Sequence, residues 1–133
     1  MTQVTPFLMY QGRVAEEAIS SYVEIVPDSR IVSLERYGTD GPGPEGTVAS
    51  GEAVIGGLTV RFFDSYVEHG FGFTPALSLF VTCADAAEVD RLAGALGEGG
   101  GVLMPPGDYG FSPWFAWVND RFGVSWQLNA EAP

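Results

Sequence analysis

Residues 5–27 read TPFLMYQGRVAEEAISSYVEIVP, and residues 76–98 repeat their pattern as ALSLFVTCADAAEVDRLAGALGE. A constant shift of 71 positions carries Leu8 to Leu79 and Ala18 to Val89. In both copies a short apolar run is followed by apolar residues at helical spacing, which predicts a strand and then a helix with one buried face. Because such a unit buries its apolar face only against its twin, we expect two matching halves with a cleft where they meet.

Turn residues divide the rest of the first half into further strands. The dipeptide Gly56-Gly57 is a strong hairpin signal, because both positions can take positive φ. Residues 38–46, GTDGPGPEG, have the composition of an exposed loop. The predicted elements are a strand at 4–10, a helix at 14–26 and strands at 30–37, 47–55 and 58–65.

The second half has the same predicted order. Asp85 is a candidate N-cap, and Glu88 completes a capping-box pattern. Asn119-Asp120 is expected to form a second hairpin turn. The predicted elements are strands at 76–83, 101–104, 111–118 and 121–128 and a helix that follows Asp85 and ends near 96. We therefore expect one α+β domain over residues 1–133, built from two βαβββ modules at about 4–65 and 76–129.

Composition excludes several classes of protein. The chain has 133 residues, 46% of them hydrophobic, and six Arg with no Lys give it a formal net charge of −11. An acidic chain of this kind lacks the basic patch that nucleic acids and anionic membranes require. One cysteine permits no internal disulfide, and neither a signal peptide nor a membrane span is recognisable. We expect a soluble cytoplasmic protein without a nucleic-acid or membrane partner.

The inventory of reactive side chains is equally restrictive. The absence of Lys rules out Schiff-base catalysis and a Lys-dependent phosphate loop. His69 is the only histidine, so a single chain cannot build a multi-His metal site. Cys83 ends an apolar strand with no electropositive neighbour in the sequence, which favours a small buried hydrophobe over a nucleophile.

Three stretches carry a family resemblance: PFLMYQGRVAEEAISSYVEIVPDSRI at 6–31, RYGTDGPGPEG at 36–46 and DRFGVSWQL at 120–128. With two βαβββ modules, the chain resembles the vicinal oxygen chelate superfamily (glyoxalase, bleomycin-resistance and dioxygenase proteins). Within it, the chain is most similar to the PhnB-like family, often labelled demethylubiquinone methyltransferase. The resemblance implies a half-open, U-shaped sheet that cups a cavity, a homodimer, and four metal-ligand positions in the metal-dependent members.

Those four positions fall on Phe7, Phe63, Ser78 and Gln127. Two phenylalanines cannot coordinate a metal, and a Ser hydroxyl with a Gln amide is a poor site for a divalent ion. The methyltransferase label also lacks support from the residues, because no glycine-rich turn is predicted to follow a strand and open a helix. We therefore expect neither a metal nor a cofactor.

The aromatic residues suggest a cavity. Phe111, Pro113, Phe115 and Trp117 alternate along a predicted strand and share one face, whereas Trp114 points to the other. Phe7 and Phe63 would form aromatic walls, and Ser78 and Gln127 would orient one polar group of a ligand. The candidates for the mouth of the cavity are Trp126, Tyr66 and His69.

Three functions remain open at this point. The first is a metal-free protein that binds an unidentified small apolar or aromatic molecule. The second is a metal-dependent enzyme of the glyoxalase or dioxygenase type whose ligands have moved to His69, Asp64, Glu68 or Gln127. The third is a structural or regulatory dimer with a vestigial pocket. The sequence does not decide whether the protein is an enzyme.

Overall fold

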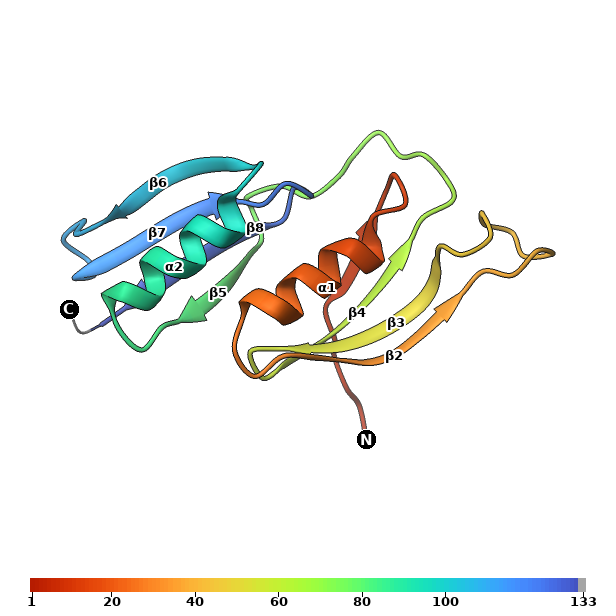
Figure 1. Ribbon diagram of the computed structural model, residues 1–133, viewed down its shortest axis with the longest axis horizontal. Coiled ribbons are helices and arrows are strands. Elements are labelled where there is room, and N and C mark those ends of the chain that lie inside the picture. Colours follow the sequence, from red (N-terminus) through yellow and green to blue (C-terminus); the bar gives the residue numbers. More distant parts are fainter. Residues whose placement is uncertain (132–133) are drawn as a thin grey trace. The chain divides into compact units, whose positions relative to one another are not determined.

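The computed structural model describes residues 1–131. The chain divides into two compact units, residues 1–72 and 73–133, here called the N-terminal unit and the C-terminal unit. Each unit contains one helix and one four-stranded sheet (Figure 1). The predicted α+β class and the two βαβββ modules are therefore confirmed.

The N-terminal unit has its helix packed on one face of a mixed sheet. Its elements are β1 (Phe7–Tyr10), α1 (Ala15–Ile25), β2 (Arg30–Arg36), β3 (Val48–Ile55) and β4 (Leu58–Asp64). The strand order is β1-β4-β3-β2, with β1 parallel to β4 and the other neighbours antiparallel. The core between helix and sheet includes Ile19 and Tyr22 from α1 and Val60 and Phe62 from β4.

The C-terminal unit repeats this arrangement strand for strand. Its elements are β5 (Ser78–Thr82), α2 (Ala86–Gly97), β6 (Gly101–Gly107), β7 (Trp114–Asn119) and β8 (Ser125–Ala130). The order is β5-β8-β7-β6, again with the first strand parallel to the last. The expected equivalence of the two halves is confirmed, because the order, the helix position and the single parallel pair all recur.

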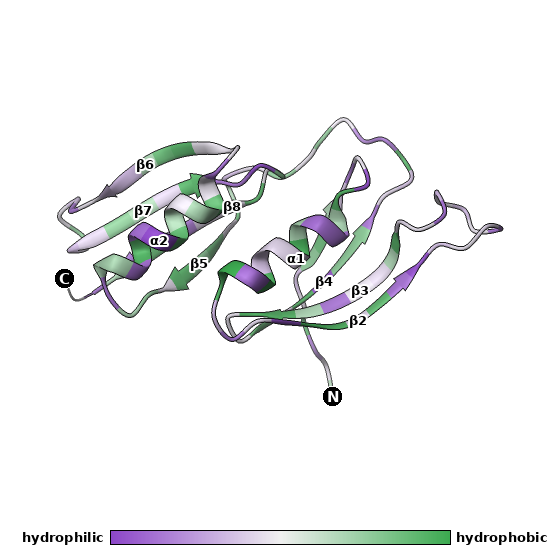
Figure 2. Cartoon of the chain, viewed as in Figure 1, coloured by the Kyte–Doolittle hydropathy of each residue, from purple (hydrophilic) through white to green (hydrophobic). Residues whose placement is uncertain are grey.

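Each sheet has a helix on one face, and the opposite face is here called the open face. Successive side chains of a strand point to opposite faces, so β8 sends Trp126, Leu128 and Ala130 to the core. Its alternate residue Gln127 points to the open face. Figure 2 shows both helices as mixtures of hydrophobic and hydrophilic residues, as expected for helices with one buried side. No helix within residues 1–131 is long and apolar enough to cross a membrane.

A buried carboxylate organises the N-terminal unit. The Asp64 side chain accepts hydrogen bonds from the backbone N–H of Ala15 (2.9 Å) and of Val48 (2.8 Å). The N-cap residue of α1, Val14, makes no side-chain cap. Asp64 therefore satisfies one of the free N–H groups at the start of α1 and ties the start of β3 to the end of β4.

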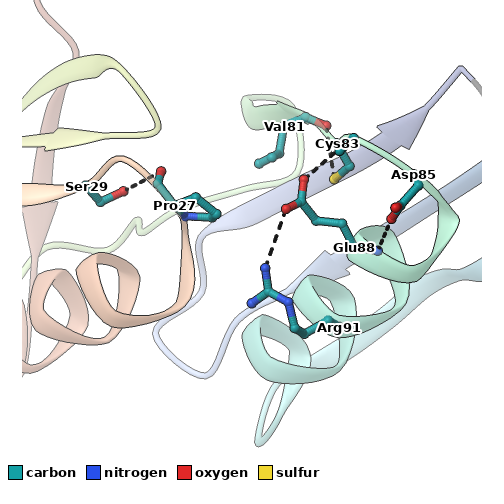
Figure 3. A network of polar contacts seen from close by, with 8 residues as sticks. Pro27, Ser29, Val81, Cys83, Asp85, Glu88 and Arg91 are labelled. Carbon is teal, nitrogen blue, oxygen red and sulfur yellow. Dashed lines mark hydrogen bonds and ion pairs between the residues drawn. The ribbon is translucent and has the colours of Figure 1, made fainter.

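The second helix caps itself, as the sequence predicted. The Asp85 carboxylate accepts from the Glu88 N–H (2.9 Å), and the Glu88 side chain accepts from the Ala84 N–H (3.0 Å), as Figure 3 shows in part. A standard capping box would direct the Glu88 carboxylate to the N–H of Asp85 itself. In this protein the return bond reaches one residue further back.

The prediction of a two-residue turn at Asn119-Asp120 is wrong. β7 continues through Asn119, and β8 begins only at Ser125. The Asp120 carboxylate accepts from the N–H groups of Phe122 (2.8 Å) and Val124 (3.0 Å), so it holds a five-residue loop instead. The flanking strands are shifted accordingly, since β7 starts at Trp114 and not at Phe111.

The strand predicted at 101–104 is also longer than expected, because β6 continues through Pro105 and Pro106 to Gly107. Prolines fit there because β6 is an edge strand and needs hydrogen bonds on one side only. The Gly56-Gly57 hairpin is confirmed, with φ values of 56° and 88°. This conformation is the one for which two consecutive glycines are suited.

The substitution Asp64→Asn tests the role of the buried carboxylate. An amide has one acceptor oxygen, so its NH2 group would face one of the two backbone N–H groups. We expect a loss of about 2 kcal/mol in the free energy of unfolding, measured by urea denaturation. Asp40→Asn, in the exposed loop, is the control and should leave the midpoint unchanged. Equal midpoints for the two variants would show that Asp64 does not stabilise the unit.

Candidate functional site

Phe7 and Phe63 lie together on the open face of the N-terminal sheet. In the parallel pair, Phe7 is opposite Arg61, and Phe63 is two residues further along β4. Their rings stack, with centroids 4.9 Å apart, and the Arg61 guanidinium carbon lies 5.6 Å from the centroid of Phe7. These two positions therefore form an aromatic pair and offer no atom that could ligate a metal.

Ser78 and Gln127 have the same relationship in the C-terminal unit. Ser78 is opposite Ser125 in the parallel pair, and Gln127 is two residues further along β8. The Gln127 amide nitrogen donates to the Ser78 hydroxyl (3.2 Å). Both groups are neutral and bonded to each other, which does not fit a divalent metal. Within residues 1–131, no group of three or more His, Cys, Asp or Glu side chains is placed to hold one.

Ser78 and Gln127 belong to a longer chain of hydrogen bonds, here called the polar chain: Trp117, Ser125, Ser78 and Gln127. The Trp117 indole N–H donates to Ser125 Oγ (2.8 Å), and the two serine hydroxyl oxygens are 2.7 Å apart. Ser125 and the indole N–H of Trp117 were not among the polar groups predicted from the sequence. The sequence could have predicted the position of Ser125, because residues two apart in a strand share a face and Ser125 precedes Gln127 by two.

A cavity of about 410 Å³ lies on the open face of the C-terminal sheet, beside the polar chain. Its lining is mostly aromatic and contains no charged side chain: Phe80, Met104, Phe111, Phe115, Trp117, Gln127 and Asn129. Phe111 and Phe115 meet edge to face, with centroids 5.0 Å apart. The expectation that Phe111, Phe115 and Trp117 share one face is confirmed.

Phe80, Met104 and Asn129 line this cavity but were not predicted from the sequence. Phe80 follows Ser78 by two residues, and Asn129 follows Gln127 by two, so strand alternation would have placed both on the open face. Met104 could not be found in this way, because its position depends on pairing with Trp117 across a register shift in β6.

The prediction that Trp126 closes a cavity mouth is wrong. Its side chain is 1% exposed and points to the helix side of β8, away from Gln127. The indole N–H donates to the buried Asp120 carboxylate (2.9 Å). Trp126 is therefore a core residue that anchors the loop at 120–124.

Tyr66, Glu68 and His69 lie in a second, more polar cavity of about 560 Å³ in the N-terminal unit. Gln11 fixes this loop, because its side chain accepts from the His69 N–H (2.8 Å) and donates to the Phe71 carbonyl (2.7 Å). His69 Nε2 is 3.2 Å from the Ser65 hydroxyl.

Among the proposed relocated ligands, the structure brings Asp64, Glu68 and His69 to this one cavity, whereas Gln127 belongs to the C-terminal unit. Both carboxylate oxygens of Asp64 already accept backbone hydrogen bonds. That carboxylate is committed to holding α1 and β3.

Cys83 is a buried residue at the end of β5, as predicted. Burial, and secondarily the nearby Glu88 carboxylate, raise the pKa of the Cys83 thiol to about 11. The Glu88 carboxylate lies 3.5 Å from Arg91, and the Cys83 sulfur is 3.9 Å from the Val81 carbonyl (Figure 3). The thiol is protonated at neutral pH, which does not suit a nucleophile.

The glycine-rich stretches lie where the sequence analysis placed them. Residues 97–101 run from the last residue of α2 to the first residue of β6, and residues 41–46 lie in the loop between β2 and β3. Neither stretch opens a helix, which is the position required for binding the phosphates of a dinucleotide.

Comparison with known proteins identifies the family. The family model described as 3-demethylubiquinone-9 3-methyltransferase matches residues 2–129. The chain belongs to this family, the PhnB-like family of the sequence analysis. It is 46% identical to the PhnB protein from Bacillus cereus, with 97% of this chain and 99% of that chain covered and a TM-score of 0.92. Comparison with curated proteins finds no match.

More distant solved structures share the fold of this PhnB-like protein. A Pseudomonas aeruginosa protein is 28% identical, with both chains fully covered and a TM-score of 0.83. The fosfomycin resistance protein FosX from Mesorhizobium loti is 16% identical over 97% of this chain and 91% of that chain, with a TM-score of 0.62. These structures share the fold that the resemblance to the vicinal oxygen chelate superfamily implied for this chain.

Proposed function

We propose that this PhnB-like protein binds a small apolar or aromatic molecule without a metal, in the cavity of the C-terminal unit. The observation that carries the proposal is the lining of that cavity: four aromatic side chains and a methionine, with two neutral amides and no charge. A space of about 410 Å³ lies within the range of small-molecule sites. An open cavity of this size supports binding over the vestigial-pocket alternative.

The chemistry of the lining favours a flat, uncharged ligand. Burial of apolar surface contributes roughly 25 cal/mol per Å². Ring contacts with Phe111, Phe115 and Trp117 add about 0.5–1.5 kcal/mol for each well-packed pair. A charged ligand would lose its hydration without gaining an opposite charge, because no lining residue is ionic.

Two observations support binding without a metal. The four positions that correspond to metal ligands in the resemblance are occupied by two pairs of side chains. Phe7 and Phe63 are stacked, and Ser78 and Gln127 are hydrogen-bonded. Neither pair presents an imidazole or a carboxylate, the groups that hold divalent ions in most protein sites.

Naphthalene is a direct probe of the proposal, because it offers two fused rings and no polar group. We expect Phe111→Ala to weaken naphthalene binding about fivefold, since it removes one ring contact of roughly 1 kcal/mol. Phe71→Ala is the matched control, because Phe111 and Phe71 are both 66% exposed and only Phe111 lines this cavity. Affinities would be measured by the ¹H–¹⁵N NMR shift of the Trp117 indole N–H.

The same titration, repeated after dialysis against EDTA, tests for a metal. We expect the chelator to change neither the naphthalene affinity nor the thermal midpoint. Retention of one equivalent of zinc, nickel or iron per chain, lost in His69→Ala, would instead support the enzyme with relocated ligands. Failure of naphthalene to shift the Trp117 signal at any concentration would overturn the binding proposal.

We further propose that the protein acts as a homodimer. Several large apolar side chains are more than half exposed on the single chain, among them Phe7, Leu77, Phe80 and Val102. A second copy related by a two-fold axis is the commonest way in which soluble proteins cover such surface.

Light scattering at micromolar concentration tests the homodimer. The expected mass is about 28 kDa, twice the 14.2 kDa of the chain. A species that remains at 14.2 kDa across a hundredfold range of concentration would contradict the homodimer and leave the binding proposal intact.

A further inference from the structure

The hydrogen bonds within the polar chain leave one hydroxyl proton without a partner. Two N–H donors enter from its ends, the Trp117 indole into Ser125 and the Gln127 amide into Ser78. Between them the two serine hydroxyls share a single contact of 2.7 Å, although each carries one proton. One hydroxyl proton is therefore left over.

Burial decides which serine keeps the unused proton. Ser125 is 1% exposed, so an unpaired hydroxyl there would carry the full penalty of a buried, unsatisfied donor. Ser125 therefore donates to Ser78. The Ser78 oxygen then accepts two hydrogen bonds, which fills both of its lone pairs. Its own proton is free, and Ser78 is only partly buried on the open face.

The orientation of Gln127 provides a matching acceptor. The amide nitrogen is the atom that contacts Ser78, so the amide oxygen Oε1 of the same planar group is left for other partners. No donor within residues 1–131 reaches Oε1. Gln127 lines the cavity, and Ser78 precedes another lining residue, Phe80, by two positions on the same face. The Ser78 hydroxyl proton and Gln127 Oε1 thus form a donor and an acceptor side by side.

From this arrangement we infer that the cavity recognises a flat, neutral ring system with a hydrogen-bond acceptor next to a donor on one edge, as in a lactam. The inference rests on the proposed function and specifies its ligand class. The ligand acceptor would take the Ser78 proton, and a ligand N–H or O–H would donate to Gln127 Oε1. A carboxylate is disfavoured, because it has no proton for Oε1 and meets no cation in the lining.

Three bicyclic probes distinguish the contribution of the ligand's polar edge to the affinity from the contribution of its rings. Quinolin-2(1H)-one has the complete edge, its 1-methyl derivative keeps the carbonyl but lacks the N–H, and naphthalene lacks both. We expect quinolin-2(1H)-one to bind the wild-type protein about tenfold more tightly than the 1-methyl derivative. Affinities would be measured by isothermal titration calorimetry.

Two variants assign the contacts. In Gln127→Met the preference for quinolin-2(1H)-one over its 1-methyl derivative should fall from about tenfold to less than twofold, because the acceptor is gone. In Ser78→Ala both lactams should weaken by a similar factor while their ratio is kept. Thr82→Ala is the control, because Thr82 lies on the same face of β5 and is exposed. Thr82→Ala should change neither the affinity for the two lactams nor the ratio of their affinities.

The outcomes distinguish this inference from the proposed function. If naphthalene does not bind, the proposed function fails and the inference fails with it. If naphthalene binds but the wild-type protein does not prefer quinolin-2(1H)-one over its 1-methyl derivative, the proposed function is supported and the inference about the polar edge of the ligand is wrong. The inference would also be overturned if Gln127→Met kept the full preference for quinolin-2(1H)-one over its 1-methyl derivative. The 1-methyl group of the probe would then weaken binding by steric exclusion and not by the loss of a hydrogen bond to Gln127. The wild-type comparison needs no variant, so it holds even if Ser78→Ala fails to fold.

Discussion

The parallel pairing of the first strand with the last strand of each unit is the constraint on which the rest of the structure depends. It fixes Phe7 opposite Arg61 and Ser78 opposite Ser125, so the next open-face residues, Phe63 and Gln127, contact the first strand in both units. A slip of one residue would turn every side chain of the strand to the other face. The core under each helix and the site on each open face are therefore set by the same register.

The two units carry different side chains at these equivalent positions. On the N-terminal sheet the equivalent pair is a stack of two phenylalanines, whereas on the C-terminal sheet it is part of a hydrogen-bonded chain. Neither pair contains an imidazole or a carboxylate, the groups that hold the metal in most zinc sites apart from thiolates. Membership of the PhnB-like family agrees with the fold, but a fold hosts many chemistries, so the function has to be argued from these side chains.

The fold was largely predictable from the sequence because its strongest signals are local. The helix pattern repeats after 71 residues, and Gly56-Gly57 forms the expected hairpin. The error at the β7–β8 turn occurred because a side chain within the turn also bonds to a side chain of β8. The buried Asp120 carboxylate holds the five-residue β7–β8 loop and also accepts from the Trp126 indole, and the preference of Asn-Asp for a two-residue turn does not include that second contact. Phe80 and Asn129 were predictable by alternation, whereas Met104 depends on an irregular register.

The central claim is that the open face of the C-terminal sheet is an aromatic binding site. Intermolecular nuclear Overhauser effects between bound quinolin-2(1H)-one and the protein test this claim most directly. The account predicts contacts from the ring protons to the Met104 methyl group and to the indole of Trp117, which line the cavity from neighbouring strands. Contacts confined to Tyr66 and His69 would place the ligand in the polar cavity of the N-terminal unit and would contradict the account.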